Sequence, residues 1–292
     1  MKIILFSRAQ IAHTPEEIRQ LFDAIELFGF DYAVNEEFAP VVRQTAGIEL
    51  PPERVYGRHI GKQPAETVMV CYGGDGTLLE GVHRLCGAPV PVMGINAGHL
   101  GFLTSAPSAG LNLIFDDIAA GRITTEPRSL LRIEGDFAER PDSTLALNEF
   151  TVQRHGAGMI SVETYVDDQM VATYHGDGVI VSTPTGSTAY SLSAGGPVVV
   201  PTCRCLVISP LAPHNLTMRP VVIPDSGVIS LRVNARRSDA FVTLDDRTHP
   251  ISHGAAFTVR RAEQQIFLAV PHNISFYDTL RNKMMWGIDI RS

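Results

Sequence analysis

The chain has 292 residues, of which 45% are hydrophobic and 19% charged, and this leaves room for two domains with sizeable cores. Its formal net charge of −7 predicts no binding to nucleic acid or to an anionic membrane, although a few local cations could still line a phosphate site. No apolar stretch reaches about 18 residues, so no membrane-spanning helix is expected.

The first part of the chain alternates strand and helix signals, which predicts a parallel sheet with helices on its faces. The apolar run 1–8 is too short for a signal peptide and is expected to form the first strand. The following elements are a helix opened by a capping box at 14–17 and closed at Gly29, a long mobile connection over 36–66, a strand at 68–71, a helix at 78–85, a strand at 91–96 and a helix at 109–120.

The segment 72–78, Tyr-Gly-Gly-Asp-Gly-Thr-Leu, joins a predicted strand to a predicted helix. Glycines at such a turn let backbone N–H groups and the helix dipole meet a phosphate. Asp75 lies inside this cradle, where a carboxylate is unfavourable unless it binds a metal or handles a proton, so the motif indicates phosphoryl chemistry. The turn is neither a Walker loop nor a good Rossmann fingerprint, because no Gly-Lys-Ser/Thr follows and Leu79 replaces the third glycine. A purely structural turn is the alternative.

A second glycine turn, 97–102, follows the strand at 91–96. Both turns are expected at the carboxyl ends of parallel strands, where such sheets bind ligands.

After residue 122 the pattern changes to a period of two, as in 161–165, 228–234 and 256–260, with a hairpin turn expected at 166–170. We therefore expect an α/β domain over 1–122 and an all-β domain over 123–272. The pattern alone assigns no role to residues 273–292.

The second domain carries a segment rich in hydroxyls and glycines, 175–197, which a strand at 179–182 enters. It suits a phosphorylated, polyhydroxylated ligand with a ring, and a polar loop closing the domain is the alternative. Asn148 and Glu149 could bind ribose hydroxyls, but an exposed strand end explains them equally. For 245–247, Asp-Asp-Arg, a hairpin turn is favoured over a role in presenting charge to a ligand.

The four cysteines have no further Cys or His at metal-ligand spacing beside them, which favours thiols in a reducing cytoplasm over a metal site. They are Cys71, Cys86, Cys203 and Cys205.

Together these motifs resemble the NAD kinase family, the ATP-dependent NAD 2′-phosphotransferases. The matching segments are 73–77, 148–149, 177–178, 183–190, 195–197 and 213–220, in the family's order from about residue 67 to 250. The run Thr-Pro-Thr-Gly-Ser-Thr-Ala-Tyr at 183–190 is the specific element, whereas Gly-Gly-Asp-Gly-Thr also occurs in diacylglycerol and sphingosine kinases.

The resemblance implies a Rossmann-like N-terminal domain, a β-sandwich-like C-terminal domain, and a C-terminal segment 273–292 that packs back on the first domain. It also implies a homodimer or homotetramer that uses Mg²⁺ with ATP to convert NAD to NADP. Asp75 would be the catalytic carboxylate beside the 2′-hydroxyl of the adenosine ribose. No residue of the chain is assigned as a metal ligand.

The NAD-binding residues that the resemblance implies are Gly74, Gly76, Phe102, Asn148, Glu149, His175, Asp177, Thr188, Ala189, Tyr190, Ser191, Leu192, Ser193 and Arg247. This chain departs from the family at two of these positions. His175 stands where the family often has Arg or Lys, and 245–247 reads Asp-Asp-Arg where the family often has Asp-Gly-Gln. A cation at 247 could still meet a phosphate.

Two other functions remain open from the residues. A lipid kinase of the diacylglycerol type would need an apolar groove, and the hydroxyl-rich segment 182–193 suits a sugar better. A sensor that binds a dinucleotide without turnover would gain nothing from Asp75 in its phosphate cradle.

Overall fold

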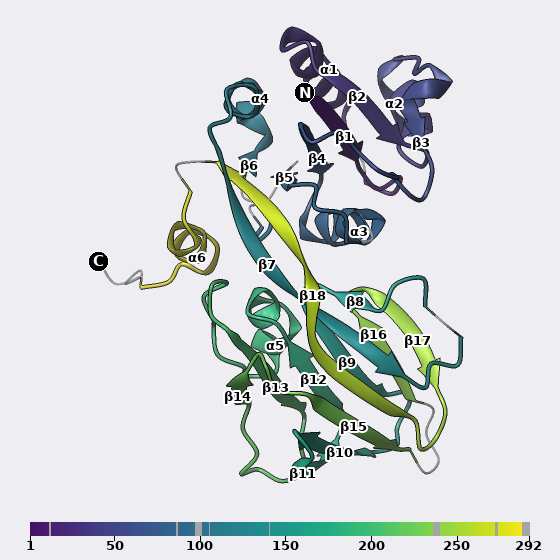
Figure 1. Cartoon of the computed structure of the whole chain (residues 1–292), viewed down its shortest axis with the longest axis vertical. Coiled ribbons are helices and arrows are strands. Elements are labelled where there is room, and N and C mark those ends of the chain that lie inside the picture. The colour runs from purple at the N-terminus through teal and green to yellow at the C-terminus, as the bar shows by residue number, and fades with distance from the viewer. Residues whose placement is uncertain are drawn as a thin grey trace. The chain divides into compact units, whose positions relative to one another are not determined.

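The computed structural model describes residues 1–292 apart from 12, 86, 97–100, 105, 140, 236–239, 272–273 and 288–292. The chain forms two compact units, which are Met1–Pro127 with Ile266–Ser292, and Arg128–Gln265 (Figure 1). These boundaries lie a few residues from the expected ones, and the C-terminal segment belongs to the first unit.

The first unit is built on a parallel sheet in the order β3-β2-β1-β4-β5-β6. Its strands are β1 (Lys2–Phe6), β2 (Asp31–Asn35), β3 (Val55–Tyr56), β4 (Thr67–Tyr72), β5 (Val92–Asn96) and β6 (Ala106–Pro107). The chain leaves β1 on one side and returns beside it as β4, which is the Rossmann order with a switch point between these two strands. The α/β prediction is confirmed.

The described residues of this unit form the α-helices α1 (Pro15–Leu27), α2 (Ala39–Ala46), α3 (Asp75–Leu85), α4 (Leu111–Ala119) and α6 (Phe276–Met284). The predicted capping box is present, because the Thr14 side chain accepts from the Glu17 amide and the Glu17 side chain accepts from the Thr14 amide. The apolar face of α1, including Ile18 and Leu21, is buried in the core of the unit.

The expectation of a long mobile connection over 36–66 is wrong. This stretch contains α2, a 3₁₀ turn (Pro52–Arg54) and β3. Pro40 lies in the first turn of α2, where a missing N–H costs nothing, so it starts the helix instead of breaking it. Phe38 and Val42 are fully buried and anchor the segment in the core.

The second unit is a sandwich of two sheets, as expected (Figure 1). One sheet has the order β14-β13-β12-β9-β16-β17, and the other contains β11-β10-β15-β18 with β7 and β8 beyond β18. The strands are β7 (Ile123–Gly135), β8 (Leu145–Ala146), β9 (Glu149–Arg154), β10 (Ile160–Val166), β11 (Gln169–Gly176), β12 (Gly178–Ser182), β13 (Cys205–Leu211), β14 (Val221–Pro224), β15 (Ile229–Asn234), β16 (Ala240–Leu244), β17 (Arg247–Ile251) and β18 (Ala256–Pro271). The start of β7, up to Pro127, and the end of β18, from Ile266, belong to the first unit.

One core fills the space between the two sheets, with Phe150 and Val181 from one sheet and Val162 and Phe257 from the other. The expected run of strands is interrupted by a 3₁₀ turn (Thr185–Thr188) and the short helix α5 (Tyr190–Ser193). These two turns lie in the hydroxyl-rich segment.

Both predicted hairpins form. β10 and β11 are joined through Asp167 and Asp168, whose φ angles are 49° and 63°, and β16 and β17 are joined through a turn in which Asp245 has φ 54°. Within the described ranges, no helix has the length and apolar character to cross a membrane.

Candidate functional site

Asp75 is the first residue of α3 and follows directly on the glycines that end β4. Gly73 has φ +152°, and a Cβ there would lie 2.5 Å from Thr77 Oγ1 and 2.7 Å from Ile11 Cδ1, so only glycine fits. A Cβ on Gly76 would lie 3.1 Å from Arg8 Nη1, which places this guanidinium beside the turn. The turn therefore puts Asp75 at the carboxyl end of β4, next to the switch point of the sheet.

The loop after β5 wraps around the Asp75 carboxylate. Oδ1 accepts hydrogen bonds from the amides of Leu103 (3.1 Å) and Thr104 (3.0 Å) and from Thr104 Oγ1 (2.8 Å). Oδ2 accepts a hydrogen bond from the Phe102 amide at 2.9 Å. A carboxylate offers about four acceptor positions. Oδ2 also receives a hydrogen bond from Lys283 Nζ at 3.5 Å, which is the longest of the five contacts to this carboxylate.

The second glycine turn is described only in part, because residues 97–100 lie outside the described residues. Gly101 is included, and a Cβ on it would lie 1.8 Å from Asp75 Oδ1. The loop can therefore close on the carboxylate only with glycine at this position.

Lys283, on α6, is a functional candidate that the motifs did not reveal. Its Nζ lies 3.5 Å from Asp75 Oδ2 and 4.8 Å from the centroid of the Phe102 ring. Phe276, on the same helix, packs near Phe102 with ring centroids 6.5 Å apart. The capping box of Ser275 and Asp278 would have predicted the helix, but no local signal shows what it faces.

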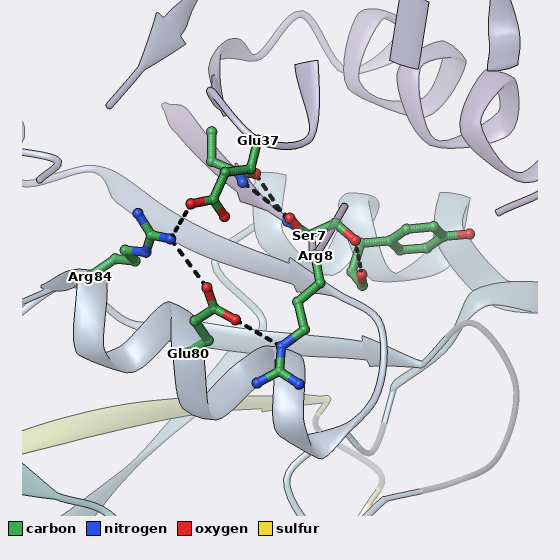
Figure 2. A network of polar contacts seen from close by, with 7 residues as sticks. Ser7, Arg8, Glu37, Glu80 and Arg84 are labelled. Carbon is green, nitrogen blue, oxygen red and sulfur yellow. Dashed lines mark hydrogen bonds and ion pairs between the residues drawn. The ribbon is translucent and has the colours of Figure 1, made fainter. Parts of the chain in front are cut away.

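A network of charges borders the glycine turn (Figure 2). Glu80 accepts from Arg8 Nε at 2.8 Å and from Arg84 Nη2 at 3.1 Å, and Arg84 Nη2 also donates to Glu37 at 2.7 Å. Figure 2 shows Arg8 and Arg84 approaching Glu80 from opposite sides. Alternating charges of this kind hold the Arg8 guanidinium in place near Gly76.

The strand ends at the switch point are tied together by hydrogen bonds to the main chain. Ser7 donates its amide to Asn35 Oδ1 (3.1 Å) and its carbonyl accepts from Asn35 Nδ2 (3.0 Å), while Ser7 Oγ donates to the Tyr72 carbonyl (2.7 Å). These contacts join the ends of β1, β2 and β4 next to the glycine turn.

In the second unit, Asn148 and Glu149 stand at the start of β9 and are 8% and 7% exposed. Glu149 Oε2 is buried without a hydrogen-bond partner, as is the Oγ of Ser182, its register neighbour on β12. Burial raises the pKa of Glu149 to about 8, and the nearby charge of Asp245 acts in the same direction, against a hydrogen bond from the Tyr190 backbone. This shift favours the protonated carboxyl, which donates as well as accepts.

The hydroxyl-rich segment packs on this pair. A Cβ on Gly186 would lie 2.1 Å from the Asn148 carbonyl, so glycine is required for the close approach. Tyr190 is exposed, and its hydroxyl accepts from Gln153 Nε2 at 2.8 Å. Ser191 is buried and bonds to Ser209 at 3.0 Å. In the rest of this run, Thr188, Ala189 and Leu192 are half-buried and Ser193 is exposed.

Three other expected site residues have different surroundings. Asp177 accepts from Arg154 Nε at 2.6 Å, and its side chain stays 46% exposed. His175 is exposed on β11, and no contact among the described residues joins it to the pair on β9. Arg247 donates to two main-chain carbonyls, those of Ser143 and Leu145.

The structure also describes three of the four cysteines and the surroundings of the acidic and histidine side chains. In the part of the chain that the structure describes, no group of three or more His, Cys, Asp or Glu side chains could hold a metal ion. Cys71, Cys203 and Cys205 are free thiols, and Cys86 lies outside the described residues.

Comparison with known proteins gives matches over nearly the whole chain. Residues 42–123 match the family described as ATP-NAD kinase N-terminal domain, and residues 147–271 match the ATP-NAD kinase C-terminal domain. The NAD kinase of Porphyromonas gingivalis is 40% identical over 299 residues, which cover 99% of each chain. The NAD kinase of Bacteroides fragilis is 35% identical over 292 residues, covering 100% of both.

The structure is also similar to solved structures of NAD and NADH kinases. The crystal structure of an NAD kinase from Archaeoglobus fulgidus in complex with ATP has a TM-score of 0.70 at 25% identity and covers 98% of each chain. Yeast NADH kinase complexed with NADH has a TM-score of 0.84 at 22% identity, covering 100% of this chain and 89% of that one, a likeness of fold.

Proposed function

The chain belongs to the NAD kinase family, and on this basis we propose that it transfers the γ-phosphate of ATP to the 2′-hydroxyl of the adenosine ribose of NAD, giving NADP. Membership makes the chain a kinase that phosphorylates NAD. The hydroxyl that receives the phosphate and the metal that accompanies ATP are the finer parts of the proposal.

One observation carries the chemical part of the proposal: four hydrogen bonds of 2.8–3.1 Å hold Asp75 at the switch point, and Oδ2 makes a further, longer contact of 3.5 Å with Lys283 Nζ. We assign Oδ2 as the acceptor of the 2′-hydroxyl hydrogen. In a loose phosphoryl-transfer transition state the nucleophile needs orientation more than early deprotonation, and a carboxylate fixed by four hydrogen bonds supplies that orientation.

Positive charge for the phosphates comes from groups on the same unit. The backbone N–H groups at the start of α3 would bind a phosphate, as helix N-termini do, and Lys283 brings an ammonium beside Oδ2. Arg8, which Glu80 holds next to Gly76, adds a second cation.

The donor set fits Mg²⁺ that arrives with the nucleotide. Asp75 is a single carboxylate beside the turn, and the described residues provide no cluster of three ligands. Mg²⁺ commonly keeps several waters and binds through substrate phosphates with one or two carboxylates, so ATP would supply most of its ligands. When bound, it neutralises charge on the phosphates.

The second unit provides the groups for the dinucleotide. Glu149 has a buried oxygen without a partner, and Asn148 beside it is also buried, which suits binding of ribose hydroxyls. Within the first unit, Phe102 next to Asp75 is the proposed apolar contact. The segment 188–193 would hold the adenosine half, with His175 and Asp177 as further polar contacts. A cytoplasmic homodimer or homotetramer completes the proposal.

The test is a coupled assay on the purified protein. It is incubated with NAD, ATP and Mg²⁺, and NADP is measured with an NADP-specific dehydrogenase. Asp75→Asn should lower turnover by about 10²–10⁴-fold while NAD still binds, because it removes the acceptor that orients the hydroxyl. Asp23→Asn, an exposed carboxylate on α1, is the matched control and should behave as wild type. Near-normal turnover of Asp75→Asn would reject the assignment, and a folded wild type that makes no NADP would reject the function.

A further inference from the structure

The hairpin turn between β16 and β17 binds the segment that leads into β9 through hydrogen bonds of both polarities. We propose that Asp245 and Arg247 are positioning residues that hold Asn148 and Glu149 in the geometry that binds the dinucleotide. This inference rests on the proposed function and assigns it two residues that act through the main chain.

Asp245 accepts from three consecutive amides. Its carboxylate receives hydrogen bonds from the N–H groups of Leu147 (2.8 Å), Asn148 (2.7 Å) and Glu149 (3.2 Å). The Asp245 amide in turn donates to the Glu149 carbonyl at 3.0 Å. A carboxylate that accepts from several amides makes a strong interaction, and Asp245 makes it from a left-handed backbone conformation with φ 54°.

Arg247 holds the residues just before this pair. Its two terminal nitrogens donate to the carbonyls of Ser143 (2.7 Å) and Leu145 (2.5 Å). Burial lowers the pKa of this guanidinium, and the charges of Asp245 and Asp246 act against that shift. The side chain is thus engaged with the protein, and this differs from the phosphate contact that its charge had suggested.

Every main-chain N–H and C=O group of residues 147–149 has a hydrogen-bond partner, either in Asp245 or in Thr183. The three amides bind Asp245, and the Glu149 carbonyl binds the Asp245 amide. Thr183 takes the other two carbonyls, with Oγ1 on Leu147 at 2.6 Å and its amide on Asn148 at 2.9 Å. With every backbone group paired, the segment has one favoured conformation.

The side chains, in contrast, keep polar atoms for a ligand. Glu149 is 7% exposed, and its Oε2 has no partner among the described residues. Burying such an atom is costly unless a ligand completes its hydrogen bonds, so the turn holds an unsatisfied group ready for the ribose. The carboxylate of Asp245 accepts from main-chain amides and is not proposed to contact the ligand itself. Its replacement should therefore weaken the binding of NAD and have little effect on phosphoryl transfer at Asp75.

The experiment compares Asp245→Asn with Asp246→Asn in the full chain. The first replaces one acceptor oxygen by an NH₂ that faces backbone donors, and we expect KM for NAD to rise by about 10- to 100-fold with turnover at saturating NAD close to wild type. Asp246 is exposed in the same turn, so its variant removes the same charge and leaves the three bonds to residues 147–149 in place. It should keep the wild-type KM.

A second variant covers the case in which Asp245→Asn folds poorly. Arg247→Lys keeps the charge but cannot donate in two directions from a planar group, and KM for NAD should rise by a smaller factor at unchanged turnover. Hydrogen exchange of the protein without ligand measures the three hydrogen bonds to Asp245 independently of enzyme activity. The amides of 147–149 should lose protection in Asp245→Asn and keep it in Asp246→Asn.

The outcomes separate the two hypotheses. If the wild type makes NADP and neither Asp245→Asn nor Arg247→Lys changes KM, the positioning role is wrong and the proposed function stands. A drop in turnover at unchanged KM would also overturn it. If the wild type makes no NADP, the proposed function fails. Unchanged hydrogen exchange of amides 147–149 in Asp245→Asn would then also reject the positioning role of Asp245.

Discussion

Glu149 owes its character to its surroundings more than to its type. It is nearly closed off from solvent, has an unpartnered oxygen and lies near the charge of Asp245. A carboxyl in that position resists ionisation because both burial and a like charge disfavour the anion. The free protein therefore maintains an unfavourable group at the point where a sugar hydroxyl would complete its hydrogen bonds.

The raised pKa of Glu149 makes the stability of the protein depend on pH. This pKa moves from 4.5 to about 8, so between these values the folded protein keeps a proton that the unfolded chain has released. The free energy of unfolding must then fall as pH rises through this window, and below 4.5 the effect vanishes. Glu149→Gln, which cannot ionise, should be more stable than wild type at pH 9 by on the order of 4 kcal/mol and nearly equal at pH 5.

Denaturant unfolding at the two pH values measures this difference. Glu263→Gln, an exposed carboxyl on β18, is the control and should show no such pH-dependent gain. Equal stability of Glu149→Gln and wild type at pH 9 would mean that the carboxyl is not held protonated in the folded protein.

Some site residues could be found from the sequence and others could not, for a physical reason. Asp75 lies in a glycine turn whose own residues indicate phosphoryl chemistry, whereas the pair at 148–149 was explained equally by a strand end, and its proposed role came from the family resemblance. Lys283 carries no such signal, because only the fold brings α6 next to Asp75 and Phe102, which are far away in the chain. For 245–247 the hairpin was predictable, but the three amides that Asp245 binds belong to another strand end.

The loop that follows β5 can approach Asp75 closely only because Gly101 has no side chain. Gly101 allows residues 102–104 to close on Asp75, and a Cβ at this position would lie only 1.8 Å from Oδ1, which leaves no room for alanine. Gly101→Ala should displace the loop or the carboxylate by about 1 Å and lower turnover by about 10²-fold, since misplacement of that size is enough to disturb a near-attack geometry.

The matched control is Gly110→Ala, because a Cβ there meets nothing within 4 Å. Both variants are compared for turnover and for melting temperature. Wild-type turnover of Gly101→Ala would show that the contact between the loop and Asp75 does not support catalysis.

The secondary structure was predictable where local capping and turn residues specify it. It was not predictable where burial in the tertiary structure stabilises an element. The helix opened by Thr14 and the hairpin at 167–168 follow from capping and turn chemistry. The helix α2 was hidden because its stretch contains prolines and polar residues, and its stability comes from burying Phe38 and Val42 in the core. Tertiary burial of this kind leaves only a weak local trace.

The path of the chain makes the first unit discontinuous. It is formed by Met1–Pro127 and completed by Ile266–Ser292, and Leu268 on β18 pairs with Val92 on β5. Periodicity alone gave no role to the last residues, whereas the family resemblance implied their return to the first domain. The structure shows what they add there, which is α6 with Lys283 next to Asp75.

A truncation tests whether α6 contributes to catalysis through Lys283. A chain that ends at Ile274 lacks the helix, and it should turn over about 10²–10³-fold more slowly, because a preorganised cation beside the reacting groups is lost. A chain that ends at Gly287 keeps α6 and should retain wild-type activity. Lys283→Met in the full chain separates the ammonium from the rest of the helix.

If Lys283→Met and the longer truncation lower turnover equally, the cation is the contribution of α6. A much larger loss in the truncation would assign a further part to packing, including the contact of Phe276 with Phe102. Turnover like wild type in the chain that ends at Ile274 would contradict both roles, and the ion pair with Asp75 would then serve only to dock the C-terminus on the first unit.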